Sequence, residues 1–155
     1  MTAASLSWDL PEPFVIEHTA QDSEVDGYGH INNSVYVQWM DRCVWEHCDA
    51  VGSSFEACQK IGKGFAAVRH EIDYLAASYS GDRVSIANWV TVNDGKLRAE
   101  RRFQIIRTLD QKTLLRARSW YICTDLNTGR PTRIPDEFKT GFNVLPSVQA
   151  AISDG

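Results

Sequence analysis

The strongest constraint on this fold is an apolar segment with helical periodicity between residues 31 and 48. Its apolar side chains recur along two adjacent lines of a helix surface: Ile31, Val35 and Trp39 on one, and Tyr36, Met40, Val44 and Cys48 on the other. Polar positions are few, so we expect protein to cover most of the circumference of this helix. A helix of about 18 residues is about 27 Å long. The rest of the chain must therefore form a layer large enough to wrap around it.

A glycine-bearing loop at residues 24–30 leads directly into this helix. Either Asn32 or Asn33 can cap the helix, because a short polar side chain accepts from the free amides of the first turn. Those amides carry a partial positive charge, and the two glycines of the loop allow close approach of a ligand or a positive φ. Asp26 lies a few residues upstream. A carboxylate next to such donors is suited to attack on a carbonyl group, with the amides polarising its oxygen.

Loop and helix together carry a spaced motif, formed by Asp26, Gly29, His30, Asn32, Asn33 and Tyr36. This motif resembles the active-site signature of the 4-hydroxybenzoyl-CoA thioesterase-like branch of the hotdog-fold superfamily. There the pattern usually reads D-x-D-x-x-G-H-V-N-N-x-x-Y, with an acidic residue about one turn later. Here Glu24 replaces the first aspartate and Ile31 replaces the valine, while Asp41 lies where the later acid is expected. The resemblance extends over roughly residues 14–142.

The resemblance implies a role for several residues of the motif. Asp26 corresponds to the catalytic carboxylate, which acts as nucleophile or as general base for water; the sequence leaves both routes open. His30 is expected to shape the site, Asn33 to point toward the thioester or the attacking water, and Gly29 to act through its backbone. Tyr36 is a candidate both for the core and for contact with the acyl group.

Two basic residues beyond the last expected strand are candidates for binding the nucleotide end of coenzyme A. Arg130 and Arg133 fall in a region where members of the resembling family often hold the phosphates of coenzyme A. The charge distribution agrees, because residues 76–155 hold twelve basic and eight acidic residues in a chain of net charge −4. This half of the chain therefore offers local positive charge to an anionic ligand. Arginines on solvated strand faces are the alternative explanation.

The remaining sequence predicts an α+β chain. Period-two alternation and turn residues place strands at about 14–19, 65–79, 84–92, 97–105 and 115–123, with short helices near 53–60 and from 135. We interpret this order as a strand, the long helix and a meander of four strands. With the resemblance, it predicts one hotdog domain over residues 1–155, a five-stranded antiparallel sheet curled around the long apolar helix. Beyond residue 146 the pattern is weak, and a frayed tail is expected.

Composition excludes several classes of protein. The mildly negative charge argues against general nucleic-acid binding, and no segment approaches the ~20 apolar residues of a membrane span. The first residues do not read as a signal peptide, so a cytoplasmic protein is expected. Neither the four cysteines nor the four histidines show metal-ligand spacing, so we expect buried thiols, no metal and no cofactor.

The sequence thus predicts a thioesterase that hydrolyses an acyl-CoA to a carboxylic acid and free coenzyme A. Two alternatives stay open: a thioesterase for acyl groups on a carrier protein, and a hotdog domain that binds acyl-CoA without turnover. Sites in the resembling branch lie at a subunit interface, which implies a homodimer or a dimer-of-dimers tetramer. The acyl group itself is left open.

Overall fold

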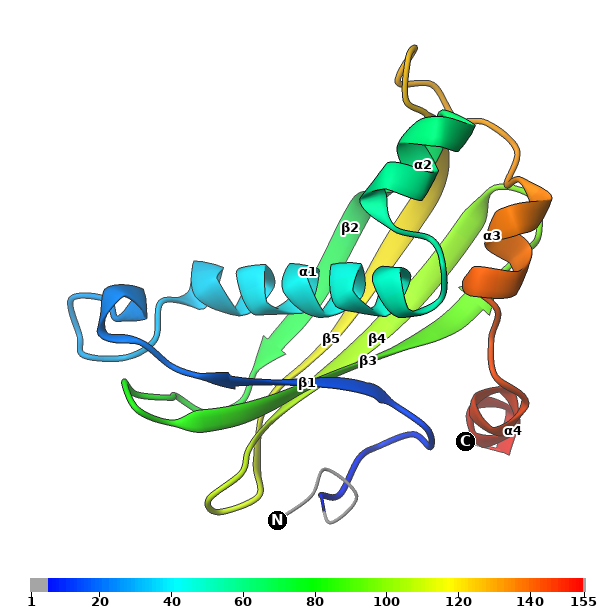
Figure 1. Cartoon of the computed structure of the whole chain (residues 1–155). Helices are drawn as coiled ribbons and strands as arrows, with labels where there is room; N and C mark the ends of the chain where they lie inside the picture. Colours follow the sequence, from blue (N-terminus) through cyan, green and yellow to red (C-terminus); the bar gives the residue numbers. More distant parts are fainter. Residues whose placement is uncertain (1–5, 155) are drawn as a thin grey trace.

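The structure, a computed structural model, describes residues 6–154 and consists of a curved antiparallel sheet with a long helix on its concave face (Figure 1). The strands are β1 (Phe14–Thr19), β2 (Lys63–Tyr74), β3 (Arg83–Asn93), β4 (Arg98–Arg107) and β5 (Lys112–Asp125). A 3-10 turn, η2 (Asp22–Glu24), precedes the long helix α1 (Asn33–Ala50). The short helices are α2 (Phe55–Ile61), α3 (Asp136–Gly141) and α4 (Pro146–Asp154). The predicted α+β architecture is confirmed.

The strands follow the order β1-β3-β4-β5-β2, and all neighbours are antiparallel. The prediction of a four-strand meander is wrong in one respect, because β2 pairs with β5 and not with β3. Only β3, β4 and β5 are joined by consecutive hairpins. The chain crosses from β2 to the far side of the sheet, where β3 lies between β1 and β4. This crossover makes β1 and β2 the two edges.

Helix α1 packs its apolar face against the sheet. Its buried side chains are Val35, Tyr36, Trp39, Met40, Cys43 and Cys48, and all but Cys48 share a core with residues of β1, β3, β4 and β5. The opposite face, which includes Gln38, Asp41 and Arg42, is exposed. The expectation that this chain covers most of the circumference of α1 is therefore wrong, because the sheet encloses one side of the helix only.

A β-bulge changes which side chains of β2 face the core. The register with β5 shifts between Ala67 and Arg69, so strict alternation does not hold through Val68. Alternation predicted that Val68 and Ile72 share one face, yet Val68 is 54% exposed while Ile72 packs on the core. The strand also ends at Tyr74, five residues before the predicted end.

Helices α2 and α3 cover the other end of the concave face. Ser54 caps α2, Gly62 ends it in the left-handed region, and Phe138 of α3 is 1% exposed within a second apolar cluster. All four cysteines are buried thiols, as predicted. Burial raises the pKa of Cys43 and of Cys48 to about 11. These thiols therefore stay protonated at neutral pH and serve as small apolar groups.

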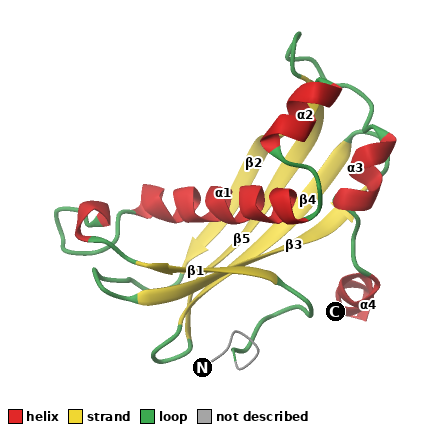
Figure 2. Ribbon diagram, viewed as in Figure 1, coloured by secondary structure: helices red, strands yellow, loops and turns green. Residues whose placement is uncertain are grey.

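The chain end departs from its prediction. A frayed tail was expected beyond residue 146, but residues Pro146–Asp154 form α4, and Val148 is 1% exposed. This helix lies apart from the other three, beside the N-terminal segment (Figure 2). Val148 shares a third apolar cluster with Ala87 and Trp89 of β3, and Trp8 and Leu10 pack against that cluster. Apolar positions on one face of α4 are enough to dock it on the sheet.

Candidate active site

The loop between β1 and α1 is folded around the carboxylate of Asp26. Its Oδ1 accepts from the backbone N–H of Tyr28 at 2.8 Å and from that of His30 at 3.2 Å. The Asp26 amide donates to the His30 carbonyl at 2.7 Å, which closes the loop. Gly29 has φ +82°, a conformation that L side chains rarely adopt. The expectation that Gly29 acts through its backbone thus has a physical reason.

Glu24, the departure from the family pattern, anchors this loop to the body of the protein. Its Oε2 accepts from the indole Nε1 of Trp39 at 2.8 Å, and its Oε1 lies 2.9 Å from His18 Nε2. Oε1 also accepts from the Gln21 amide at 2.8 Å. Burial opposes ionisation of Glu24, but the hydrogen bonds from His18, Trp39 and Gln21 outweigh it and lower the pKa of the carboxyl.

The N-terminus of α1 is capped by Asn32 and not by Asn33. Asn32 Oδ1 accepts from the Ser34 amide at 3.0 Å, and the Asn32 carbonyl accepts from the Val35 amide at 2.9 Å. The amides of Asn32, Ser34 and Val35 each donate to an acceptor in the protein. Among the described residues, no acceptor forms a hydrogen bond with the Asn33 amide. Asn33 is therefore the position at which the helix N-terminus offers a donor to a ligand.

A pocket of about 460 Å³ lies at this end of α1 and collects four of the predicted site residues. It is lined by Asp26, Tyr28, His30, Ile31, Asn33 and Tyr36, by Tyr74 at the end of β2, and by residues 75–77 after it. The His30 ring lies edge-on to Tyr79, with ring centroids 5.3 Å apart. The structure thus brings Asp26, His30, Asn33 and Tyr36 to one cavity.

Tyr36 is both a core residue and part of the pocket wall. It is 3% exposed, and its hydroxyl is hydrogen bonded to Ser78 Oγ at 2.6 Å. The Ser78 carbonyl also accepts a hydrogen bond from the Ile31 amide at 2.9 Å. Tyr36 and Ser78 therefore fix the segment after β2 against the start of α1 and give the pocket a rigid wall.

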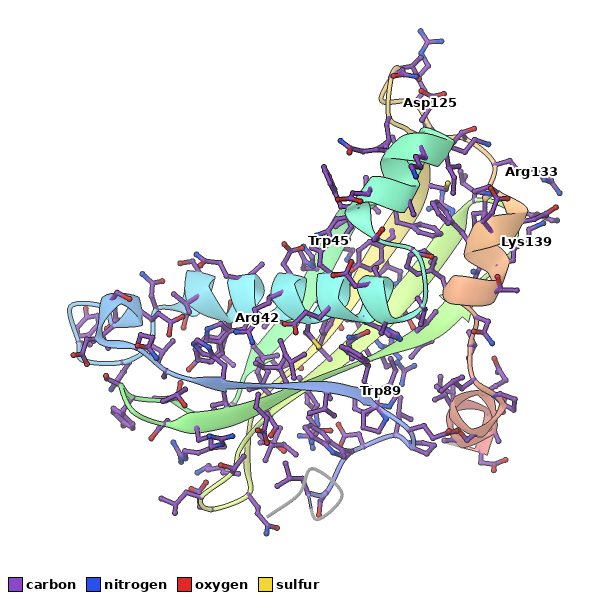
Figure 3. The ribbon with its side chains drawn as sticks, in the orientation of Figure 1. Arg42, Trp45, Trp89, Asp125, Arg133 and Lys139 are labelled. Atoms are coloured by element: carbon purple, nitrogen blue, oxygen red, sulfur yellow. The ribbon has the colours of Figure 1, made fainter. Side chains whose placement is uncertain are left out.

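Arg130 and Arg133 do not reach this pocket within one chain. They follow β5, and Figure 3 places Arg133 at the opposite end of the molecule from the loop before α1. The Arg133 carbonyl accepts from Lys63 Nζ at 3.2 Å, and both arginine side chains lie outside the buried core. A site that contains Asp26 and these arginines needs a second copy of the chain.

A groove between α1, β2 and β5 holds Asp41, which lies where the motif expects its later acid, together with polar residues that the motif did not indicate. It has a volume of about 250 Å³ and is lined in part by Gln38, Asp41, His70 and Ser119. His70 Nδ1 lies 2.6 Å from Ser119 Oγ. These two residues are 49 positions apart, and only the pairing of β2 with β5 brings them together. Local spacing carries no signal for such a pair.

Comparison with known proteins decides the family. The sequence profile described as the thioesterase-like superfamily matches residues 20–142. The chain belongs to the thioesterase-like superfamily. Two chloroplastic acyl-acyl carrier protein thioesterases of Arabidopsis thaliana, ATL2 and ATL3, are 27% and 25% identical over 127 and 129 residues. Each alignment covers 82% of this chain but 66% of the relative, so the chain spans just under two thirds of the length of these relatives.

Solved structures confirm the hotdog fold expected for this superfamily. A 1,4-dihydroxy-2-naphthoyl-CoA thioesterase from Synechocystis has a TM-score of 0.76 at 19% identity, covering 84% of this chain and 96% of its own. A Staphylococcus aureus protein solved in complex with CoA has a TM-score of 0.77 at 16% identity, covering 85% of this chain and 82% of its own. At such identities the likeness concerns the fold.

Two further features of the described residues bear on the site. Among residues 6–154, no group of three or more His, Cys, Asp or Glu side chains is arranged to hold a metal ion. In the same part of the chain, no helix is both long and apolar enough to cross a membrane.

Proposed function

We propose that this protein hydrolyses the thioester of an acyl-CoA, with Asp26 as the carboxylate that drives the reaction. The observation that carries the proposal is the position of Asp26 in the pocket that also holds His30, Asn33 and the N-terminus of α1. Membership of the thioesterase-like superfamily supports the same chemistry. The local geometry supports a role for each of these residues.

Asp26 is oriented by its backbone contacts. Both amide donors bind Oδ1, and no hydrogen bond to Oδ2 occurs among the described residues. Oδ2 is therefore the oxygen that takes a proton from water or attacks the thioester carbon. As general base, Oδ2 takes a proton from water while the water oxygen bonds to the acyl carbon, the C–S bond breaks, and the leaving thiolate takes up a proton. As nucleophile, Oδ2 bonds to the acyl carbon and expels the thiolate, and water then cleaves the resulting anhydride, which frees the carboxylic acid, regenerates the Asp26 carboxylate and supplies the proton for the thiolate.

Charge that develops on the thioester oxygen needs a donor nearby. The amides of Ile31, Asn32, Ser34 and Val35 already donate within the protein, whereas the Asn33 amide has no acceptor in the described part of the chain. We assign the polarising role to the Asn33 N–H, aided by the partial positive charge of the helix N-terminus. The Asn33 side chain is then positioned to orient water or substrate.

A homodimer would complete the site. Within the chain β2 pairs with β5 alone, and residues 66–71 are exposed along its outer edge. A 12-residue edge strand leaves a row of unpaired backbone groups. Pairing of two β2 edges about a two-fold axis would satisfy them and cover the open face of α1 with a second copy. Arg130 and Arg133 of that copy are the proposed ligands of the coenzyme A phosphates.

The decisive experiment is release of free thiol from a panel of acyl-CoA esters, compared with the same acyl groups on a carrier protein. Faster turnover of the CoA esters supports the proposal. Faster turnover of the carrier-bound esters favours the second candidate, because the relatives ATL2 and ATL3 are named as acyl-acyl carrier protein thioesterases. Binding of acyl-CoA without thiol release from any ester would show a non-catalytic domain instead.

A further inference from the structure

A charged side chain is buried beneath the C-terminal half of α1. Arg101 of β4 is 3% exposed, and its Nη1 donates to Asn88 Oδ1 at 2.5 Å and lies 2.8 Å from His47 Nδ1. Its Nη2 reaches the Cys48 thiol only at 3.8 Å. The guanidinium carbon lies 5.3 Å from the centre of the Phe142 ring. All these partners are neutral groups or weak acceptors.

No carboxylate balances this charge inside the described part of the chain, where none of the ion pairs within 4.0 Å involves Arg101. His47 does not supply a compensating charge, since burial and the neighbouring Arg101 lower its pKa to about 4 and leave the ring neutral. Because a guanidinium can only donate, Nδ1 of the neutral His47 ring accepts the hydrogen bond from Arg101 Nη1. A buried cation with neutral partners alone is unfavourable, and an anion placed beside it removes that penalty.

Arg101 also lines an empty space. An apolar hollow of about 120 Å³ lies under α1 and α2, with Arg101 and Phe142 in its wall and Trp45 at its rim. Figure 3 shows Trp45 on the side of α1 that is turned toward α2, where its ring meets Phe55 with centroids 5.8 Å apart. Aromatic and aliphatic side chains dominate the remaining wall. Such a lining suits a hydrocarbon chain, with one charged group at its end.

This hollow adjoins the groove between α1, β2 and β5. Val44 and Tyr121 line both spaces, so the two hollows share a wall. Together they reach the lower part of the ~300–1,000 Å³ range of small-molecule sites. Asp41 and His70 line the groove on the open, polar side of α1, and Arg101 lines the hollow.

We infer that the hollow under α1 and α2 binds the distal end of the acyl group and that Arg101 selects substrates whose far end carries a carboxylate. This inference rests on the proposed thioester hydrolysis and on the proposed dimer for its setting, because within one chain the hollow lies near the other end of α1 from the Asp26 pocket. The anion site itself does not require turnover. An apolar chain would fill the hollow, and a bidentate or single contact of its terminal carboxylate with Arg101 would replace the missing counter-charge. A chain that ends in a methyl group would leave the cation unbalanced.

The first test uses the wild-type protein and pairs of CoA esters with the same chain length, one ending in a methyl group and one in a carboxylate. We expect kcat/KM to be at least tenfold higher for the carboxylated member at one or more chain lengths. Equal or lower values for the carboxylated member at every length would overturn the inference while leaving thioester hydrolysis intact.

The second test asks whether Arg101 carries the preference. In Arg101→Gln the ratio of kcat/KM between the paired esters should fall at least tenfold, and Arg101→Lys should restore part of it. Arg98→Gln removes an exposed arginine from the same strand and should leave the ratio unchanged. A ratio that is the same in wild type and in folded Arg101→Gln would give Arg101 a structural role only.

A third measurement separates this inference from the proposed function. Hexanoate and hexanamide differ in charge but hardly in shape, and their effect on thermal unfolding can be measured without any thioester. Hexanoate should raise the melting temperature of the wild-type protein more than hexanamide does. If no ester is hydrolysed but this difference persists, the anion site stands and the proposed activity fails. Equal shifts for both compounds would contradict the anion site.

Discussion

The carboxylate of Glu24 and the indole of Trp39 are joined by a 2.8 Å hydrogen bond that ties the Asp26 loop to the middle of α1. The two residues are fifteen positions apart, and Trp39 is 3% exposed. The loop is thus held by a buried donor of the helix, in addition to its own backbone bonds. An aspartate at position 24 would have a side chain one methylene shorter. The position of Asp26 therefore depends on Glu24.

We predict that Glu24→Gln lowers the stability of the protein at neutral pH and that this loss shrinks as the pH falls below the ordinary glutamate pKa. The pKa of Glu24 is lowered in the folded state. Its ionised form therefore stabilises the fold above the ordinary glutamate pKa, and this contribution is lost as the pH falls through the lowered value. Urea unfolding at several pH values measures the difference. If the difference in the free energy of unfolding between wild type and variant does not shrink with falling pH, the charge of the Glu24 carboxylate is not the cause of that difference.

We predict that Asp26→Asn lowers kcat by at least ~10²-fold while the protein stays folded and still binds substrate. Asparagine keeps the size of the side chain and accepts the same two backbone N–H groups, but it cannot take a proton or attack the thioester. Turnover of an acyl-CoA, with circular dichroism and ligand binding, measures this.

Asp125→Asn is the matched control, because Asp125 Oδ1 also accepts two backbone N–H groups in a turn, which Figure 3 places far from the loop before α1. That turn carries Arg130, so the control should keep its kcat even where KM for CoA esters changes. Turnover of Asp26→Asn within about fivefold of wild type would make that carboxylate structural, and Glu24 would be tested next.

We predict that replacing Arg130 and Arg133 by alanine raises KM for CoA esters about five- to thirtyfold and changes kcat little. An exposed ion pair contributes up to ~1 kcal/mol, and the nucleotide end takes no part in bond breaking. A short thioester without the nucleotide should show no change. Lys112→Ala removes a basic residue from the start of β5 and serves as the control. Equal losses with both substrates would remove the arginines from the site.

We predict that Val148→Ala costs about 1–3 kcal/mol of stability and that deletion of residues 146–155 costs more. Val148 is 1% exposed and packs with Trp89 on β3, so truncation leaves a cavity and uncovers apolar surface. Thermal or urea unfolding measures both changes. Gln149→Ala, on the exposed side of the same helix, is the control and should lie within ~0.5 kcal/mol of wild type. A truncated chain as stable as the full one would show that α4 does not dock in solution.

We predict that the protein is at least a dimer and that the β2 edge forms the contact. Light scattering should give a mass of two chains or a multiple of two. Val68→Asp places a charge on the exposed edge of β2 and should shift the distribution toward monomer. Leu109→Asp, at a 92% exposed position of the β4–β5 turn, should not. A fully active monomer at micromolar concentration would contradict both the contact and the shared site.

Several elements followed from local sequence alone. Strand β1 and the 18-residue α1 were predicted from period and capping. The motif from Asp26 to Tyr36 was readable because it lies within one loop and one helix. These features depend on backbone preferences over a few residues, so a single stretch of sequence is enough to specify them.

Other features appear only when distant segments meet. The pairing of β2 with β5, the bulge at Ala67 and Arg69, and the docking of α4 through Val148 depend on which surfaces are left uncovered by the rest of the chain. The anchoring of Glu24 by Trp39 and the burial of Arg101 beside His47 join residues 15 and 54 positions apart. Sequence therefore determined the helix, the strands and the reactive loop. Tertiary structure decided which polar groups are buried, because burial depends on packing between segments that local periodicity does not relate.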